Sequence, residues 1–97
     1  MYARVVTVQI KPGMTDEATR LYQDSVVPAG KQQAGCVGMY LLVDQATGKG
    51  ISVVLCDSEA SMIASETSGY LNQQLAKFGP LMTAPPTTGR FEVAVKA

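Results

Sequence analysis

Hydrophobic and polar side chains alternate along four segments of the chain, and a period of two residues predicts β-strands. The alternation indicates strands over residues 3–10, 36–44, 51–56 and 90–96. The loop that joins the second strand to the third is short and contains Gly48 and Gly50, which is typical of a hairpin. Pro12 and Gly13 form a turn signal directly after the first strand.

Between these strands, apolar residues recur at the spacing of an α-helix. The first predicted helix begins at Thr15, a candidate N-cap, and ends near Gly35. Pro28 lies late in this helix and is expected to kink it or to start a new turn. A second helix is predicted over residues 59–66, and a third helical segment over residues 70–78 follows the polar break "ETSG".

The order strand, helix, strand, strand, broken helix, strand predicts an α+β fold of the ferredoxin-like βαββαβ type. Such a fold has a four-stranded antiparallel sheet with its helices on one face. Ninety-seven residues form one small domain, so we expect residues 1–97 to fold as a single unit.

Apolar residues occur on both faces of the predicted sheet. One face is expected to carry Val6, Val8, Ile10, Met39, Leu41, Val43, Ile51, Val53, Leu55, Phe91, Val93 and Val95. The other is expected to carry Ala3, Val5, Tyr40, Leu42, Val54, Cys56 and Ala94. Strands that are apolar on both faces are buried on both. Because the helices cover only one face, we expect a homodimer in which two sheets pack face to face.

Composition narrows the function classes. The formal net charge is zero and no run of basic residues exists, which argues against binding to nucleic acid or to an anionic membrane surface. The chain has no signal-peptide pattern and no apolar run long enough to span a membrane, so a cytoplasmic location is expected. It has no histidine, the commonest zinc ligand and general base, and neither a metal nor a cofactor is expected.

The stretch from Val26 to Asp44, "VVPAGKQQAGCVGMYLLVD", resembles the signature of the antibiotic-biosynthesis-monooxygenase-like domains. The opening "VTVQIKPGMTDEA", the helix start "DSEASM" and the final "FEV" fit the same pattern. The resemblance implies a dimeric α+β barrel. Members of this family include small oxygenases that oxidise quinol-type or polyketide aromatics without metal or flavin, and others that degrade haem.

The sequence departs from that family at three positions. Where the family often carries a Trp and two His residues, this chain has Cys56, Ser65 and Tyr70. The departure argues against haem degradation by the histidine-bearing route, and against an oxygenase that depends on those side chains. Cys36 and Cys56 are expected to be diagonal neighbours on one strand face, with Cys56 facing Gly38 across the hairpin. Two reduced and buried thiols are favoured, and a disulfide between them is the alternative.

Three polar residues are candidates for catalysis. Tyr70 and Asn72 lie near the helix break, where they could orient a substrate hydroxyl or stabilise an oxyanion; alternatively they are a packing residue and a solvated one. Arg90 could hold an anionic substrate, but it is more readily explained as a surface or dimer-contact arginine that pairs with Glu92 or with an acid of a second copy. Arg4 is interpreted in the same way as a surface or dimer-contact residue.

A further set of side chains could line an apolar substrate pocket: Tyr22, Tyr40, Met39, Met62 and Phe78. Each is more readily explained as a core residue. The sequence thus favours a cofactor-independent monooxygenase or isomerase that acts on a small aromatic or quinone-like molecule. The alternative is a homodimer that binds a small ligand without catalysis, for example in a stress response; an association module for other enzymes is a third hypothesis.

Overall fold

The computed structural model describes residues 1–97. Its elements follow one another in the predicted order: β1 (Tyr2–Gln9), α1 (Thr15–Leu21), the π-helical turn η1 (Tyr22–Val26), α2 (Val27–Lys31), β2 (Cys36–Asp44), β3 (Lys49–Cys56), α3 (Glu59–Thr67), α4 (Tyr70–Phe78), the 3₁₀ turn η2 (Gly79–Leu81) and β4 (Thr87–Glu92).

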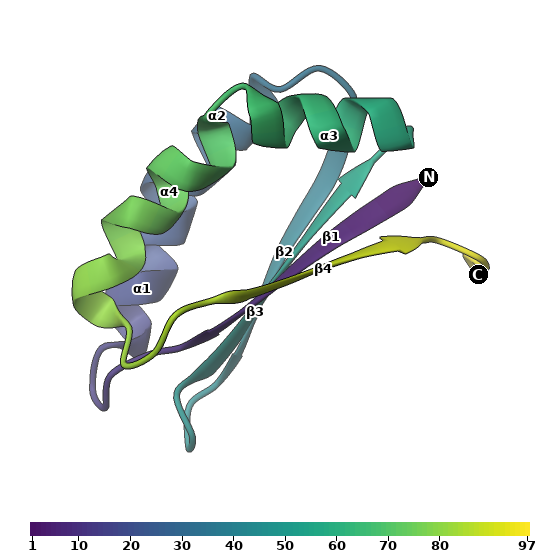
Figure 1. Cartoon of the computed structure of the whole chain (residues 1–97). Helices are drawn as coiled ribbons and strands as arrows, with labels where there is room; N and C mark the ends of the chain where they lie inside the picture. The colour runs from purple at the N-terminus through teal and green to yellow at the C-terminus, as the bar shows by residue number, and fades with distance from the viewer.

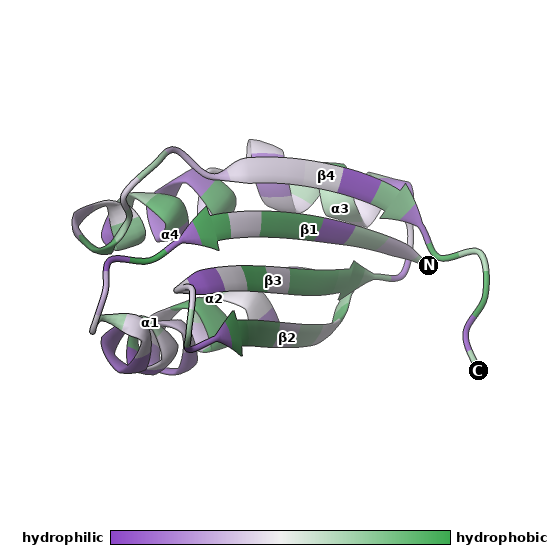
Figure 2. Cartoon of the chain, turned by 90° about the horizontal axis from the view of Figure 1, so that it is seen from below, coloured by the Kyte–Doolittle hydropathy of each residue, from purple (hydrophilic) through white to green (hydrophobic).

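The four strands form one antiparallel sheet in the order β2-β3-β1-β4, the ferredoxin-like topology that the sequence predicts. All helices lie on one side of this sheet (Figure 1). Seen from the opposite side, no helix lies in front of the sheet, and β2 and β3 consist mostly of hydrophobic residues (Figure 2). The prediction of helices on one face is confirmed.

The first helical segment changes its winding next to Pro28. The π-helical turn ends at Val26, and a new α-helical stretch begins at Val27 with Pro28 in its first turn. Proline has no N–H to donate to the preceding turn, so a helix must adapt its hydrogen bonding there. The expected new turn at Pro28 is confirmed, and the wide turn leaves Tyr22 and Val26 buried toward the sheet.

The strand register corrects the predicted division of the sheet faces. Val53 pairs with Val5, and Leu55 pairs with Ala3. Because directly paired residues point to the same side of a sheet, Val53 and Leu55 lie on the face opposite Val6. Phe91 pairs with Ala3 and lies on that outer face as well. Alternation shows which residues of one strand share a face, but the register decides which face it is.

The last strand lies earlier in the sequence than predicted, at Thr87–Glu92 and not at residues 90–96. Its partner β1 begins at Tyr2, and the last backbone hydrogen bond beyond the strand runs from the Val93 N–H to the Met1 carbonyl at 2.9 Å. No strand is left to pair with the residues that follow. The alternating pattern "VAVK" therefore continues beyond the available hydrogen-bonding partners.

Two buried clusters hold the helices onto the sheet. The larger contains Ile10, Ala18, Tyr22, Val26, Phe78 and Leu81. The smaller contains Val54, Cys56 and Met62 and lies under α3. Cys36 faces Cys56 directly, because a bulge after Cys36 shifts the register, so the expected pairing of Cys56 with Gly38 is wrong. The two thiols are free, with 4.0 Å between their sulfur atoms.

Candidate functional site

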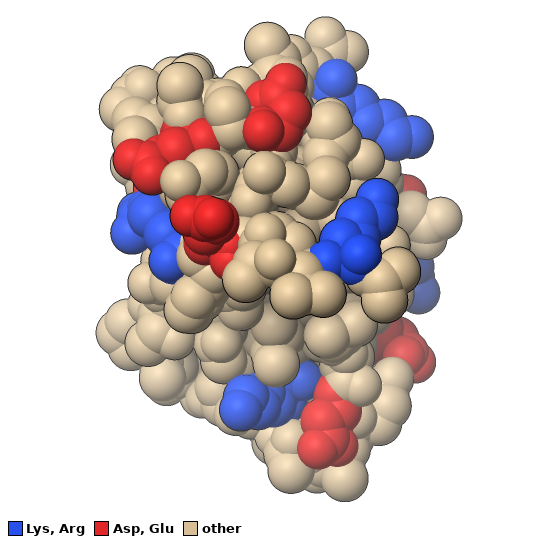
Figure 3. All heavy atoms as spheres, turned by 90° about the vertical axis from the view of Figure 1, so that its right-hand side faces the viewer, with Lys and Arg blue, Asp and Glu red and all other residues tan.

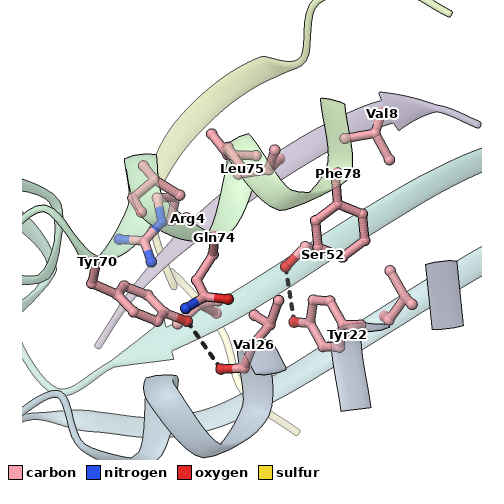
Figure 4. Close-up of a pocket in the computed structure, with 13 residues that line it drawn as sticks. Arg4, Val8, Tyr22, Val26, Ser52, Tyr70, Gln74, Leu75 and Phe78 are labelled. Atoms are coloured by element: carbon pink, nitrogen blue, oxygen red, sulfur yellow. Dashed lines mark hydrogen bonds between the residues drawn. The ribbon is translucent and has the colours of Figure 1, made fainter. Parts of the chain in front are cut away.

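A cavity opens between the inner face of the sheet and helix α4 (Figure 4). The enclosed part of this cavity is small, about 50 Å³, and it opens into a wider mouth with which the empty space totals about 520 Å³. Ten of its thirteen lining residues are hydrophobic. The lining residues are Arg4, Val6, Val8, Tyr22, Val26, Leu41, Ser52, Val54, Tyr70, Leu71, Gln74, Leu75 and Phe78.

Tyr22 reaches the cavity from the π-helical turn. Its hydroxyl lies 2.9 Å from the Ser52 hydroxyl and donates to the Tyr40 carbonyl at 3.3 Å. Burial raises the pKa of Tyr22, and the hydrogen bond with Ser52 opposes that shift in part. Tyr22 is therefore a neutral phenol at pH 7 whose hydrogen-bonding capacity is largely used within the protein.

Tyr70 begins α4 and points into the same cavity (Figure 4). Its hydroxyl makes one long hydrogen bond, to the Val26 carbonyl at 3.4 Å. The ring fits because Gly30 has no side chain: a Cβ atom there would lie 2.8 Å from the Tyr70 hydroxyl oxygen. Burial raises the pKa of Tyr70 to about 12, so it acts as a hydrogen-bond donor and not as a base at neutral pH.

Arg4 is the one cationic side chain in the cavity wall, and it is only 1% exposed. Its Nη1 donates to the Ser65 hydroxyl at 2.8 Å, and that hydroxyl donates in turn to the Met62 carbonyl at 2.7 Å. The same Nη1 lies 3.6 Å from a carboxylate oxygen of Glu66. The Nε and Nη2 groups of Arg4 are buried and have no hydrogen-bond acceptor in the protein.

Glu66 lies between two arginines. Arg90 binds its carboxylate through Nε, at 2.8 Å and 3.1 Å from the two oxygens, and through Nη2. This hydrogen bonding, with the charges of Arg90 and Arg4, lowers the pKa of Glu66 despite partial burial. Glu66 therefore stays ionised at neutral pH and shares one negative charge between two cations.

The structure brings Tyr22, Tyr70 and Phe78 together in the cavity wall. Their roles in binding or catalysis stay predictions. Asn72 is exposed and does not line the cavity, because it lies two residues after Tyr70 and therefore on the opposite side of the helix. The expectation that Asn72 borders the pocket is corrected.

The other predicted side chains also lie outside the cavity. Tyr40 is 59% exposed on the outer face of the sheet. Met39 packs against both buried clusters, and Met62 is a core residue of the smaller one. Arg90 is exposed and pairs with Glu66, which replaces the expected pairing with Glu92.

Sequence reasoning missed Arg4 as a site residue. A signal was present in the strand pattern. Arg4, Val6 and Val8 alternate with Ala3, Val5 and Thr7, so Arg4 shares the inward face with two valines. An arginine in phase with the core side of a strand is rarely buried without a purpose or a partner.

Charges of both signs are interspersed over the face of the molecule in Figure 3. None of the helices has the length and apolar character needed to cross a lipid bilayer. No group of three or more His, Cys, Asp and Glu side chains is placed to hold a metal ion.

Comparison with solved structures shows which proteins share this architecture. A crystal structure of an antibiotic biosynthesis monooxygenase (ABM) covers 98% of this chain and all of that chain, with a TM-score of 0.77 at 18% identity. A candidate ABM protein from Bordetella bronchiseptica covers 97% of each chain with a TM-score of 0.80 at 16% identity. The chain has the ABM fold. Rv0793 of Mycobacterium tuberculosis shares it, with a TM-score of 0.76, 17% identity and coverage of 99% of this chain and 97% of that one.

Comparison of the sequence with known proteins assigns no activity to this chain. No protein-family model matches the chain. Two uncharacterized proteins of Mycobacterium tuberculosis, Rv2558 and Rv2557, are 35% and 34% identical to it over 65 residues, which is 67% of this chain. The match covers only 28% and 29% of those relatives, so the chain spans less than a third of their length.

The positions at which the sequence departs from the ABM pattern lie around Arg4. Tyr70 lines the cavity, Ser65 accepts the Arg4 hydrogen bond, and Cys56 is fully buried beneath α3. Burial raises the pKa of Cys56 to about 11. The cavity thus offers apolar walls, neutral phenol donors and one cation, and no group with a pKa near 7.

Proposed function

We propose that this chain binds a small aromatic molecule in the cavity and oxidises it with O₂ without a cofactor. The observation that supports this most directly is an apolar cavity in which Tyr70 has a hydroxyl with only one long hydrogen bond. The monooxygenase names of proteins with the same fold favour the same function.

The proposed chemistry is carried mainly by the substrate. A hydroquinone or phenol bound against Tyr70 ionises more readily, because a hydrogen bond to the anionic form stabilises the phenolate. The electron-rich anion then reacts with O₂, one oxygen atom enters the ring and the other leaves as water. The substrate supplies all four electrons and is released as a quinone (from a phenol) or a hydroxyquinone (from a hydroquinone). Tyr70 turns its single O–H from the Val26 carbonyl to the substrate oxygen, and the apolar walls exclude bulk water. The substrate proton leaves to solvent, since the cavity has no suitable base.

The experiment is O₂ uptake under air with a panel of hydroquinones. We expect Tyr70→Phe to lower uptake by roughly tenfold or more, because one donor to the developing anion is lost. Gln73→Ala, an exposed change on the same helix, is the control and should leave uptake unchanged. Equal uptake by wild type and Tyr70→Phe would refute the role of Tyr70.

A second candidate function is binding without catalysis. The absence of any side chain with a pKa near 7 in the cavity favours it. Under this hypothesis the protein binds aromatic ligands with micromolar affinity, and no hydroquinone of the panel supports O₂ uptake above the rate in buffer. Titration calorimetry beside the uptake assay separates the two functions.

We also propose that two copies associate through the uncovered sheet face. Large apolar side chains are exposed there: Tyr40 at 59%, Leu42 at 52% and Phe91 at 57%. An apolar face of this kind is unfavourable in water and marks an interaction surface. Light scattering of Leu42→Lys should report a monomer, whereas Ile63→Lys, an equally exposed position on α3, should leave the dimer intact. A monomeric wild type at micromolar concentration would contradict the proposal.

A further inference from the structure

We infer that the ligand of this cavity carries a carboxylate, and that Arg4 binds it through Nε and Nη2. The inference rests on the proposed function only in placing the ligand in the cavity. It adds the chemical class of the ligand, an aromatic acid, and the residue that recognises it.

The first argument is the state of the Arg4 guanidinium. Arg4 is 1% exposed, and of its three nitrogen atoms only Nη1 has a partner. A buried donor without an acceptor costs free energy, and a buried charged donor costs more. The two nitrogen atoms without a partner, Nε and Nη2, lie on the same edge of the planar guanidinium group. This edge is the fork that binds both oxygens of a carboxylate.

The second argument is charge. Glu66 is the only acidic side chain that contacts Arg4, but its two oxygens are already bound by Arg90. Arg4 and Arg90 carry two positive charges against one carboxylate, so the buried group retains a positive charge. The other titratable groups that face Arg4 are Tyr22, Tyr70 and Cys56. All three are neutral at pH 7 because burial opposes their ionisation.

The third argument is the surroundings of the fork. Arg4 lines the cavity together with ten hydrophobic residues, and Figure 4 shows its guanidinium on the side where Tyr70 and Gln74 lie. A bare inorganic anion would satisfy the fork but leave the apolar walls uncovered. A phosphate would need several further donors at that end of the cavity. An aromatic monocarboxylate neutralises the charge of Arg4 and also covers the apolar walls of the cavity.

The test compares 1-naphthoate with its neutral isostere 1-naphthamide by titration calorimetry at pH 7. We expect the wild type to bind the acid at least about tenfold more tightly than the amide, as a bidentate charged contact provides. This preference should disappear in Arg4→Met and persist in Arg20→Met, which removes an exposed arginine on α1. Arg4→Lys retains the charge without the fork and should keep only part of the preference.

Each other outcome has a defined meaning. Equal binding of acid and amide by the wild type overturns the carboxylate inference and leaves the aromatic-binding proposal intact. Binding of neither probe overturns both. A preference that survives in Arg4→Met, or that is lost in Arg90→Met alone, moves the anion away from Arg4 and also overturns the inference.

A measurement on the wild-type protein tests the contact between Arg4 and the ligand without requiring that the Arg4 variants fold. The chain contains only Arg4, Arg20 and Arg90 as arginines, so its Nε–H signals in a nitrogen-15 spectrum are few. Arg20→Lys and Arg90→Lys assign the Arg4 signal by elimination. We expect 1-naphthoate to shift that signal and 1-naphthamide to leave it nearly in place. An unmoved Arg4 signal at saturating 1-naphthoate would refute the contact.

Discussion

Replacement of Glu66 by glutamine tests the electrostatics of the cavity wall. The side chain of Glu66 is 15% exposed and lies between Arg4, which is buried, and Arg90, whose side chain is 49% exposed. Glu66→Gln preserves shape and one hydrogen-bond acceptor but removes the negative charge. The variant therefore leaves the Arg4 guanidinium buried without a counter-charge, whereas Arg90 remains open to water.

The magnitude follows from the two ion pairs. At 3.6 Å the Arg4–Glu66 interaction is worth roughly 4 kcal/mol before desolvation, with the effective dielectric constant of about 20 that suits such sites. The half-exposed Arg90 pair contributes about 0–1 kcal/mol. Because the amide keeps a hydrogen bond, we expect Glu66→Gln to lower the free energy of unfolding by about 2–3 kcal/mol. In a domain of this size that corresponds to a fall in Tm of roughly 10–20 °C.

The assay is urea unfolding at a fixed protein concentration, at several pH values between 7 and 3. The pKa of Glu66 is lower in the folded protein than its ordinary value of 4.5. Its stabilisation is therefore complete above pH 4.5 and is lost as the pH falls through the lowered folded pKa. The difference between wild type and Glu66→Gln should be full at pH 7 and shrink below pH 4.5.

Arg90→Met is the matched control for this experiment. It removes the exposed partner of Glu66 and leaves the buried one, so it should cost at most about 1 kcal/mol. The reasoning is refuted if Arg90→Met costs as much as Glu66→Gln, or if the Glu66→Gln deficit is the same at pH 7 and pH 3.

Two further predictions concern the thiols and the helix contact. Burial raises the pKa of Cys56 to about 11, so iodoacetamide at pH 8 should modify half-buried Cys36 well before Cys56 in the folded protein. Peptide mass spectrometry follows the order, and early modification of Cys56 would contradict it. Gly30→Ala should lower the stability by about 1–2 kcal/mol, because its Cβ would lie 2.5 Å from the Met39 sulfur and 2.8 Å from the Tyr70 hydroxyl oxygen. An unchanged or higher Tm would show that the contact relaxes freely.

Much of the fold could be predicted because its signals are local. The sequence pattern predicts the hairpin strand Cys36–Asp44 and the helix over residues 70–78 with the bounds that the structure has. Each depends on a periodicity and on end signals within a few residues. The predicted ends of β4 are wrong because a strand ends where its hydrogen-bonding partner ends, and the position of that partner is a property of the assembled sheet.

The side of the sheet to which a residue points could not be read in the same way. Val53 and Val6 each belong to a clearly alternating strand, yet their relative phase depends on the register between strands. The predicted set of inward residues was therefore a mixture of both faces. Arg4 is a different case, because alternation within its own strand already groups it with Val6 and Val8; the register adds that Ser52 and Val54 lie beside them in the cavity wall.

Helix geometry explains why only part of the predicted site is assembled. Tyr70, Gln74 and Phe78 are spaced by four residues, so they lie on one stripe of α4, and all three are buried. Asn72 is rotated by about 200° from Tyr70, at roughly 100° per residue, and faces away from the cavity. The spacing rule that identifies the packing stripe also excludes Asn72, so this part of the site was accessible from the sequence.

The helix break connects the charge network with the apolar wall. Ser65 and Glu66 lie at the end of α3 and contact Arg4, while Tyr70 opens α4 and lines the cavity. Gly69 has a φ of 88°, a left-handed conformation that glycine adopts without strain, and it lets the chain turn within a few residues. The short segment from Ser65 to Tyr70 thus supplies both Glu66, the partial counter-charge of Arg4, and Tyr70, a neighbour of Arg4 in the cavity wall. A ligand that completes the neutralisation of Arg4 should consequently stabilise the helix break as well as fill the cavity.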